Sequence, residues 1–576
     1  MSGFCSVVLV DPALSHLDRV FTYSIPDGMP ARVGSLVRAP FRRRPRLGVV
    51  TDLLDVPDIE RPLELAGLVG PGLDEQTVDL ARWVSHRYLS TFGEALATAL
   101  PQRVAHEEDS PAPATRHSAR AALDLSAYTR GDDLARALES GSPTSDGPGS
   151  SSTGFVWRPL PSEDRARQIV AMVAQAAQRG GVIVLVPEVR VRSEVLTELG
   201  NEFGDAIAMV GSERVARERY RDWLALRTGA KRIAVGSRGT VFAPVSDLRL
   251  ILIDDEGHQS YKEGRAPRYH ARTVAAERAR GAGATLVLVG VPPSVEARAA
   301  TERGPYVLVA PTRAEERRHR PSVTVIEQGT LVPSATTVNA AKDELAAGRR
   351  VVLITHRSGT NADLVAERAI RILSPAKPAQ LDASSKPSDV ARAVRSADLI
   401  CATPFIAKDL ALPGAGLLAL LEVDAALAQP EYRAAEDSFA TWWRAARWAS
   451  EGRIFIETAQ PSHPAITALT RWDPDALYRA EAARRRELGY PPFAALARID
   501  VPADRATDVA REVAAAGVEV LGPVEKEGRT VVVARARRRE QLLRALEPIV
   551  SHWRASDEPM RVDVDPWEVL VPKWRS

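Results

Sequence analysis

The sequence has almost no cysteine and no long apolar segment. Cys5 and Cys401 are the only cysteines among its 576 residues. Two distant cysteines cannot form a disulfide framework or a multi-cysteine zinc site, and such scarcity is typical of a reducing compartment. No apolar run reaches the roughly 18 residues of a membrane span, and Asp11 and Asp18 interrupt the start where a signal peptide would be apolar. We therefore expect a cytoplasmic protein with no membrane partner.

A strong net charge is also missing. The formal charge is +2, with 45% hydrophobic and 26% charged residues. That composition is typical of globular domains with substantial cores, and the length fits roughly three to four domains. The overall charge therefore does not by itself indicate a nucleic-acid binder.

The basic residues are nevertheless clustered. "APFRRRPRLG" contains Arg42, Arg43, Arg44 and Arg46, with Arg38 just before it, and "VVVARARRREQLL" contains Arg537 and Arg538. Such clusters are typical of phosphate-binding surfaces and equally of solvated loops, so both interpretations stay open.

The chain divides by pattern and composition. Residues 1–104 alternate short β-like runs with turns and then become helical, which predicts a small β-rich domain closed by helices. Residues 105–153 are rich in Ser, Pro, Gly and acids, which indicates a low-complexity linker with at most a short helix near residues 132–139.

Two further segments, 154–327 and 328–474, alternate aliphatic strands with amphipathic helices. Runs such as "VIVLVPE", "TLVLVGVP" and "GLLALLEVD" lack polar alternation, which predicts parallel sheets covered on both faces. Residues 475–576 change to an α+β pattern. The predicted fold class is α/β: two tandem lobes between a small β-rich domain and an α+β domain.

One strand of the first lobe ends in acids. "LRLILIDDEG" places Asp254, Asp255 and Glu256 directly after an aliphatic run, an arrangement that in nucleotide-hydrolysing domains holds magnesium. Such a site also needs a G-x-x-x-x-G-K-[ST] loop to bind the phosphates, and the sequence has no such loop.

Several motifs together resemble the primosomal protein N-prime (PriA) family. They include "VGSRGTVFAPVSDLRLILIDDEGHQSYK", "PRYHARTVAAERA", "THRSG", "GRIFIETAQP" and "YPPFAALARID", and the resemblance covers nearly the whole chain except the linker. It implies two RecA-like helicase lobes flanked by an N-terminal domain that binds forks and 3′ ends and by a C-terminal domain. It further implies replication restart at branched or abandoned forks, with single-stranded DNA, single-strand DNA-binding protein, primosome components and the replicative helicase as partners.

The chain departs from the family at its ATP and zinc sites. Asp164 and Arg165 stand where the family's phosphate-binding Lys and Thr belong, and Asp255 replaces the Glu of an Asp-Glu-Glu-His motif. Arg447 matches one of the two arginines expected later, and Ser450 occupies the position of the other. The eight zinc-binding cysteines of the family are absent. We therefore expect a degenerate nucleotide site, no catalytic residues, no metal and no cofactor.

The resemblance also nominates DNA contacts. "SYKEGRAPRYHAR" matches the family's aromatic-rich loop and contributes Tyr261, Lys262, Arg268, Tyr269 and Arg272. Phe21 and Tyr23 match the pocket that grips a 3′ end, although Thr22 replaces its acid. Aromatic rings stack on bases and cations meet phosphates, but the same aromatics are also typical of core packing.

The leading hypothesis is a replication restart protein that binds forks and promotes primosome assembly without its own ATPase. Two alternatives remain: a divergent ATP-dependent 3′-to-5′ DNA helicase, and a protein-interaction scaffold without DNA binding.

Overall fold

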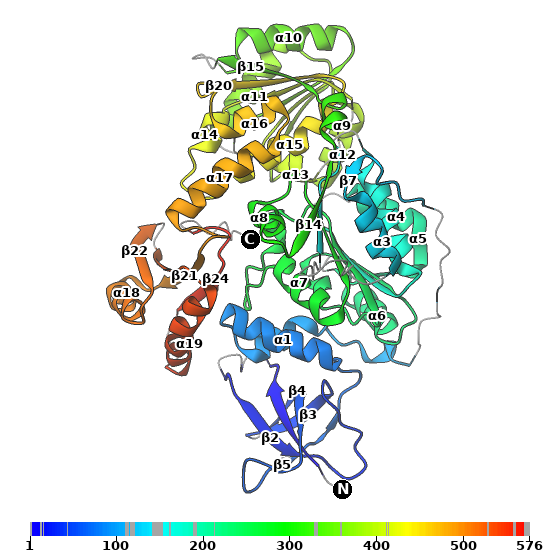
Figure 1. The fold of residues 1–576 in the computed structure, drawn as a ribbon, viewed down its shortest axis with the longest axis vertical. Coiled ribbons are helices and arrows are strands. Elements are labelled where there is room, and N and C mark those ends of the chain that lie inside the picture. The colour runs from blue at the N-terminus through cyan, green and yellow to red at the C-terminus, as the bar shows by residue number, and fades with distance from the viewer. Residues whose placement is uncertain are drawn as a thin grey trace.

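The computed structural model describes residues 3–11, 14, 17–42, 44–109, 115, 121–140, 154–160, 163–187, 193–211, 214–327, 332–356, 360–409, 412, 414–526, 529–556 and 560–569. Four sheets organise them. Figure 1 shows the N-terminal sheet at one end of the molecule and the second lobe at the other, with the first lobe between them and the C-terminal domain beside α1 and α17. The predicted fold class is confirmed.

The N-terminal domain is one antiparallel sheet, apart from a parallel edge pair, followed by two helices. Its strand order is β5-β2-β1-β4-β3-β6, from β1 (Phe4–Leu9), β2 (Val20–Ser24), β3 (Leu36–Phe41), β4 (Arg44–Leu54), β5 (Leu63–Glu64) and β6 (Gly67–Leu68). Helices α1 (Glu75–Tyr88) and α2 (Phe92–Ala99) begin at capping side chains of Asp74 and Thr91, which satisfy free backbone N–H groups.

The first lobe is a sheet of order β10-β11-β9-β12-β13-β8-β14-β7, parallel except for β7. Its strands are β7 (Tyr128–Thr129), β8 (Gly154–Trp157), β9 (Gly181–Leu185), β10 (Ile207–Met209), β11 (Ile233–Gly236), β12 (Leu248–Ile253), β13 (Thr285–Val289) and β14 (Tyr306–Pro311). Its helices are α3 (Gly131–Ser140), α4 (Arg165–Ala177), α5 (Glu194–Phe203), α6 (Ala216–Arg227), α7 (Ala271–Ala282), α8 (Val295–Arg303) and α9 (Arg313–Arg318).

The second lobe is fully parallel, with order β15-β20-β19-β16-β18-β17. Its strands are β15 (Ser322–Glu327), β16 (Arg350–Ile354), β17 (Pro378–Leu381), β18 (Leu399–Ala402), β19 (Ala415–Leu420) and β20 (Arg453–Thr458). Its helices are α10 (Ala335–Ala346), α11 (Thr360–Leu373), α12 (Pro387–Ser396), α13 (Phe405–Asp409), α14 (Val423–Leu427), α15 (Ala434–Ala446) and α16 (Pro464–Arg471).

Helix α17 (Pro474–Leu488) leads into the C-terminal domain. That domain is an antiparallel sheet of order β22-β23-β21-β24 with two helices. Its elements are β21 (Ala495–Val501), α18 (Ala506–Ala515), β22 (Glu519–Lys526), β23 (Arg529–Ala536), α19 (Arg539–Ala555) and β24 (Arg561–Val564).

Two predicted domain bounds separate elements that pack together in the structure. The region expected to be a linker contains β7 and α3, which pack on the first lobe, with Leu134 and Leu138 buried. The short helix expected near residues 132–139 is α3, and its apolar residues are spaced for one helical face. Strand β15, placed in the first lobe by the boundary at residue 327, pairs with β20 of the second. The other boundaries stay predictions.

The hydrophobic cores join the domains. One cluster of buried residues runs from Tyr88 of the N-terminal domain through Tyr269 of the first lobe to Val562 of the C-terminal domain. Another joins the opposite face of the first lobe to Trp443 and Trp472 of the second. Continuous burial of this kind holds the domains in a defined arrangement.

Candidate functional site

The acids at the end of β12 are buried where the two lobes meet. Asp254, Asp255 and Glu256 are at most 4% exposed. Asp255 has a φ of 49°, in the left-handed region that Asp tolerates better than most residues. Buried carboxylates are costly unless paired, so the partner of each one decides what the site can do.

Asp255 is bound by an arginine of the other lobe. Arg444, on α15, donates from Nε and Nη2 to the two carboxylate oxygens at 2.8 and 2.7 Å. Burial alone would raise the pKa of Asp255, but the Arg444 guanidinium outweighs it and holds that pKa below its ordinary value. In this bidentate pair each carboxylate oxygen of Asp255 accepts a hydrogen bond from Arg444.

Asp254 lies against arginines as well. Arg165, the first residue of α4, approaches it with Nε 3.4 Å from Oδ1. Burial raises the pKa of Asp254, with Arg165 and Arg447 acting in the opposite direction. Arg447 contacts Glu194 only at 4.0 Å, and burial together with the nearby Arg165 lowers the pKa of Arg447 to about 10. The structure thus brings Arg165, Asp254, Asp255 and Arg447 together and adds Arg444, whereas the expected Asp164 is exposed.

Glu256 has its own set of donors. Arg272 Nη1 lies 2.5 Å from Oε2, and Ser294 donates from its backbone N–H at 2.6 Å and from Oγ at 3.0 Å. Burial raises the pKa of Glu256, and the Arg272 charge opposes that rise. Glu256 therefore anchors α7 to the start of α8.

The start of α4 is occupied by the chain itself. Asp164 is the N-cap, and its Oδ1 accepts from the backbone N–H of Arg167 at 3.0 Å. A helix N-terminus that binds phosphate needs these N–H groups free. Beside it, burial raises the pKa of Glu163 to about 7, and the Tyr128 hydroxyl donates to this carboxyl.

These residues do not fit Mg-ATP bound in the family's manner. Arginines neutralise Asp254 and Asp255, and a carboxylate caps the helix that would receive phosphate. The arrangement clamps the lobes together, and Asp254, Asp255 and Glu256 each lie against an arginine.

A second ionic cluster reinforces this contact. Glu296 of α8 is bound by Arg433 of the second lobe and by Arg485 of α17, and Arg485 Nη2 reaches Glu436 at 2.6 Å. The Glu436 side chain also accepts from the backbone N–H of Val295 at 2.7 Å. Buried charges that are shared in this way fix geometry strictly, because any shift leaves one of them unpaired.

The aromatic loop expected to contact DNA is buried. Tyr261 and Tyr269 are 0% and 1% exposed. The Tyr261 hydroxyl donates to the carbonyl oxygens of Asp254 and Leu185 at 2.5 and 3.1 Å, and Tyr269 packs against Phe242. The expectation that these rings stack on bases is wrong for this arrangement of the chain, because tertiary contacts enclose them.

The cations of the same loop hold the C-terminal domain. Lys262 Nζ lies 2.7 Å from Asp563 and donates to the Val564 carbonyl at 2.9 Å. Arg268 donates to the Val562 carbonyl at 3.3 Å, and burial lowers the pKa of Arg268. These contacts to β24, together with the Arg272–Glu256 pair, engage Lys262, Arg268 and Arg272 within the protein.

The N-terminal arginines are placed differently. Arg38, Arg42 and Arg44 are exposed along β3 and the turn into β4, and Arg46 is half-buried and paired with Asp11 at 2.7 Å. Arg43 lies outside the described residues. Arg42 covers the ring of Phe41 at 5.6 Å. A solvent-facing set of guanidinium groups therefore remains available for phosphate contact.

The residues matched to the 3′-end pocket are mostly internal. Tyr23 is buried and donates to the Pro40 carbonyl at 3.0 Å, and Phe21 is half-buried against Phe41. The Thr22 hydroxyl donates to Asp58. The carboxylate of Asp58, from a later loop, therefore lies beside Thr22, the position at which the family has an acid. At the other end of the molecule, Arg537 and Arg538 are exposed where β23 leads into α19.

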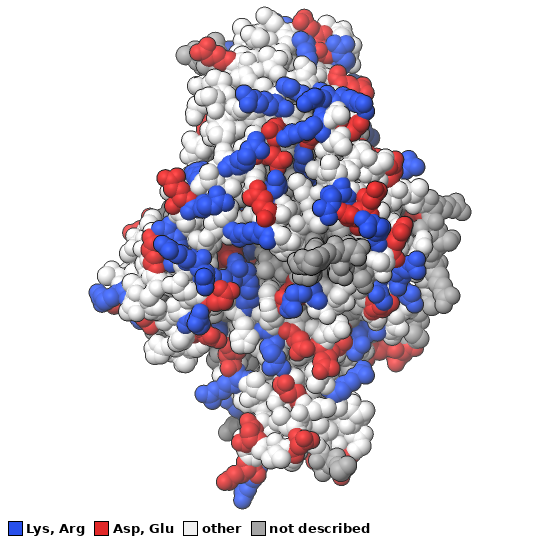
Figure 2. Space-filling model, viewed as in Figure 1, with Lys and Arg blue, Asp and Glu red and all other residues white. Residues whose placement is uncertain are grey.

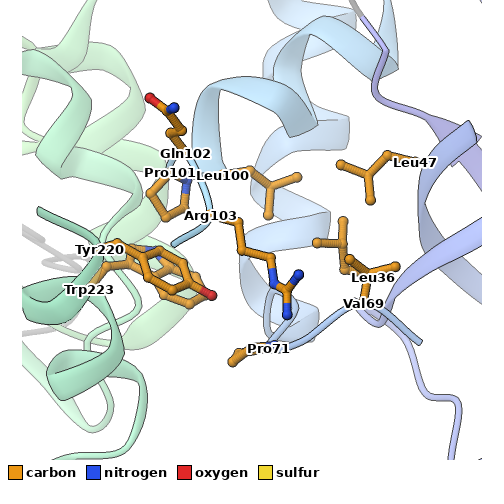
Figure 3. Close-up of a pocket in the computed structure, with 10 residues that line it drawn as sticks. All are labelled: Leu36, Leu47, Val69, Pro71, Leu100, Pro101, Gln102, Arg103, Tyr220 and Trp223. Atoms are coloured by element: carbon orange, nitrogen blue, oxygen red, sulfur yellow. The ribbon is translucent and has the colours of Figure 1, made fainter. Parts of the chain in front are cut away.

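A cavity of about 200 Å³ lies between the N-terminal domain and the first lobe (Figure 3). Leu36, Val69 and Leu100 line one side, while the rings of Tyr220 and Trp223 come from α6 on the other. The Tyr220 hydroxyl donates to Glu108, which also binds Arg103. This polar bridge closes the junction between the two domains.

Among the described residues, no three His, Cys, Asp or Glu side chains lie together as a set that could bind a metal ion. Cys5 and Cys401 are both buried, in different domains. Within the same ranges no helix combines the length and apolar character needed to cross a membrane.

Comparison with known proteins identifies both flanking domains. Residues 7–101 match a family model described as 3'DNA-binding domain (3'BD), and residues 486–567 match the Primosomal protein N C-terminal domain. A solved structure, the DUF1998 helicase MrfA bound to DNA, is 13% identical with a TM-score of 0.40, covering 64% of this chain and 55% of its own. That score is too low to add to the fold described from the sheets.

Curated relatives align along most of the chain. Replication restart protein PriA of Treponema pallidum is 27% identical over 96% of this chain and 98% of its own. Probable replication restart protein PriA of Mycobacterium bovis is 29% identical over 86% of each. PriA of Bacillus subtilis is 24% identical over 67% of this chain, which spans 60% of that relative. With both flanking domains matched and relatives of one name aligned between them, the chain is similar to the PriA family over most of its length.

Proposed function

We propose that the protein acts in replication restart by binding branched or abandoned forks as a scaffold that does not hydrolyse ATP. The proposal that ATP is not hydrolysed is carried by the bidentate pair between Arg444 and Asp255 across the lobes. With Arg165 on Asp254, arginines of the chain itself occupy the carboxylates that a nucleotide-bound metal would need.

The N-terminal domain supports the proposal that the protein binds DNA. Arg38, Arg42 and Arg44 are exposed on a domain that matches a 3'DNA-binding domain model. Arg537 and Arg538 provide a second exposed basic site on the C-terminal domain. Because contacts to phosphate position a protein without selecting a sequence, two such sites on a rigid body suit recognition of fork geometry.

The partners follow from the same role. We propose that single-strand DNA-binding protein, primosome components and the replicative helicase assemble on the fork-bound protein. Neither ATP nor zinc takes part in this proposal, because the buried acids are already paired and the two cysteines are far apart in the chain.

The test is equilibrium binding to a fork with a single-stranded gap, against plain duplex, at two salt concentrations, with and without Mg-ATP. Phosphate release is recorded in the same samples. We expect fork-selective binding that weakens with salt, ignores Mg-ATP and releases no phosphate. Binding to neither DNA would favour a protein-interaction scaffold instead.

A divergent ATP-dependent helicase is the second candidate. It is favoured by Arg165 and Arg447, whose ion-pair contacts are long, at 3.4 and 4.0 Å, and by the Arg165 charge that adds to burial in lowering the pKa of Arg447. Two such cations could receive a phosphate group if the lobes opened. DNA-stimulated phosphate release that is lost in Arg165→Ala would establish it.

A further inference from the structure

Arginines form a band on the surface where α9, α16, α17 and α8 meet. We define the arginine band as Arg303, Arg313, Arg317, Arg318, Arg320, Arg471, Arg479, Arg484 and Arg486, all of them exposed. Figure 2 shows Lys and Arg side chains gathered in a diagonal run over α9, α16 and α17. Apart from Arg486, at the start of the matched C-terminal domain, these residues lie outside both matched domains.

Shared contacts show that the band is continuous. Arg313 of α9 and Arg479 of α17 both pair with Asp473, each at 3.5 Å. Arg320 donates to the Thr470 carbonyl at 2.5 Å, next to Arg471. At the far end of α17, Arg486 and Arg303 both lie over the ring of Phe493, at 4.3 and 5.0 Å.

The acids of this region lie beneath the arginines. The side chains of Arg479 and Arg484 are 64% and 52% exposed, whereas their partners Asp473 and Glu481 are only 21% and 6% exposed. Each guanidinium carries five N–H groups, so a single carboxylate beneath it leaves outward-facing donors. Glu302 and Glu487 are exposed in the same region, but the outermost charge is mainly positive.

We propose that the arginine band binds the phosphate backbone of a DNA arm held by the same molecule, separately from the N-terminal and C-terminal arginines. This inference rests on the proposed function. Protein partners are usually recognised through an apolar, aromatic centre, and among the described residues Leu488 is the one exposed large hydrophobic residue on these helices. Planar, outward-facing guanidinium groups fixed from below suit phosphate recognition without sequence preference.

The test uses three arginines that make no ion pair among the described residues, so their removal leaves no buried charge behind. In Arg317→Ala/Arg471→Ala/Arg486→Ala we expect fork binding at least about tenfold weaker, and a salt dependence of log K reduced by about 3. The triple Arg→Lys variant at these positions keeps the charge and should restore most of the slope. The matched control replaces the exposed Arg136, Arg392 and Arg511, which lie away from the band, and should bind like the parent protein.

The outcomes separate the inference from the proposed function. If the parent protein fails to bind forks, the proposed function fails. If the parent binds but the Ala triple keeps its affinity and slope, the band is not a DNA surface and the proposed function stands. If the Ala triple keeps DNA binding but loses binding of poly-glutamate, the band is a surface for acidic proteins and the proposal is overturned. Thermal unfolding of every variant confirms that it is folded.

Discussion

Arg444 of the second lobe and Asp255 of the first form a buried bidentate ion pair, with N···O distances of 2.8 and 2.7 Å. It is the direct link between the strand that would carry a catalytic acid and the opposite lobe. A lobe pair that opens and closes with a nucleotide would have to break this link in every cycle. In this protein both partners of the link are side chains of the chain itself, and no nucleotide takes part in it.

Removing Arg444 should destabilise the protein. In Arg444→Met the Asp255 carboxylate stays buried without a partner, and we expect the free energy of unfolding to fall by about 3 to 5 kcal/mol. Urea unfolding followed by circular dichroism measures it. Adding Asp255→Asn to the same chain should recover part of the loss.

The control for this prediction is an exposed pair. Arg392 and Asp389 are 68% and 44% exposed, so Arg392→Met should change stability by less than about 0.5 kcal/mol. Equal losses in Arg444→Met and Arg392→Met would mean that the lobes are not clamped by Asp255.

Glu163 should make stability depend on pH. Its pKa is raised from 4.5 to about 7 in the folded chain, so between these values the folded state holds a proton that the unfolded state has released. The free energy of unfolding therefore falls as the pH rises from about 4.5 to 7. Glu163→Gln removes the titrating group, and its melting temperature should fall less over this window than that of the parent protein.

The exposed Glu198 on α5 provides a matched glutamate. Glu198→Gln should follow the parent protein across the whole pH series. A Glu163→Gln profile parallel to the parent's would show that this carboxyl does not carry the effect.

The aliphatic runs alone predict both parallel sheets, because strands buried on two faces carry no polar alternation. They do not predict which sheet receives an edge strand. "SVTVIE", now β15, alternates apolar and polar residues, and only its pairing with β20 assigns it to the second lobe. The local sequence pattern identifies a strand, whereas its long-range pairing decides to which sheet it belongs.

The candidate site was predicted less completely. Asp254, Asp255 and Arg447 do converge, but Arg444 was missed because Arg447, about one helical turn later, holds the motif position. Tyr261 and Lys262 have the composition of a surface loop, and nothing near them in the sequence indicates that β24 covers them. A residue's exposure depends on segments hundreds of positions away.

The burial of the aromatic loop leads to a prediction opposite to its sequence interpretation. Tyr261→Phe leaves the Asp254 carbonyl without its donor, while the Leu185 carbonyl still accepts from the backbone N–H of Asp254 at 2.9 Å, and we expect a loss of about 1 to 3 kcal/mol in stability. Fork affinity, measured by fluorescence anisotropy on protein that remains folded, should stay within about twofold of the parent. A large loss of affinity without a loss of stability would return Tyr261 to the DNA surface.

The exposed arginines of the N-terminal domain should carry fork binding in proportion to their number. Replacing Arg38, Arg42 and Arg44 by Ala removes three solvent-facing cations without touching the Arg46–Asp11 pair. Each lost phosphate contact should lower the slope of log K against log salt by about 0.9 on duplex DNA, or about 2.7 in total. Anisotropy titrations at several salt concentrations give this slope directly.

The Arg46→Ala variant is the internal control for that titration. Because Arg46 is half-buried and already bound to Asp11 at 2.7 Å, its removal should change the slope by much less than the loss of any exposed neighbour. If Arg46→Ala lowers the slope as much as Arg42→Ala, the ion pair with Asp11 must open on DNA. The basic turn would then reorganise around the phosphates instead of meeting them as it stands.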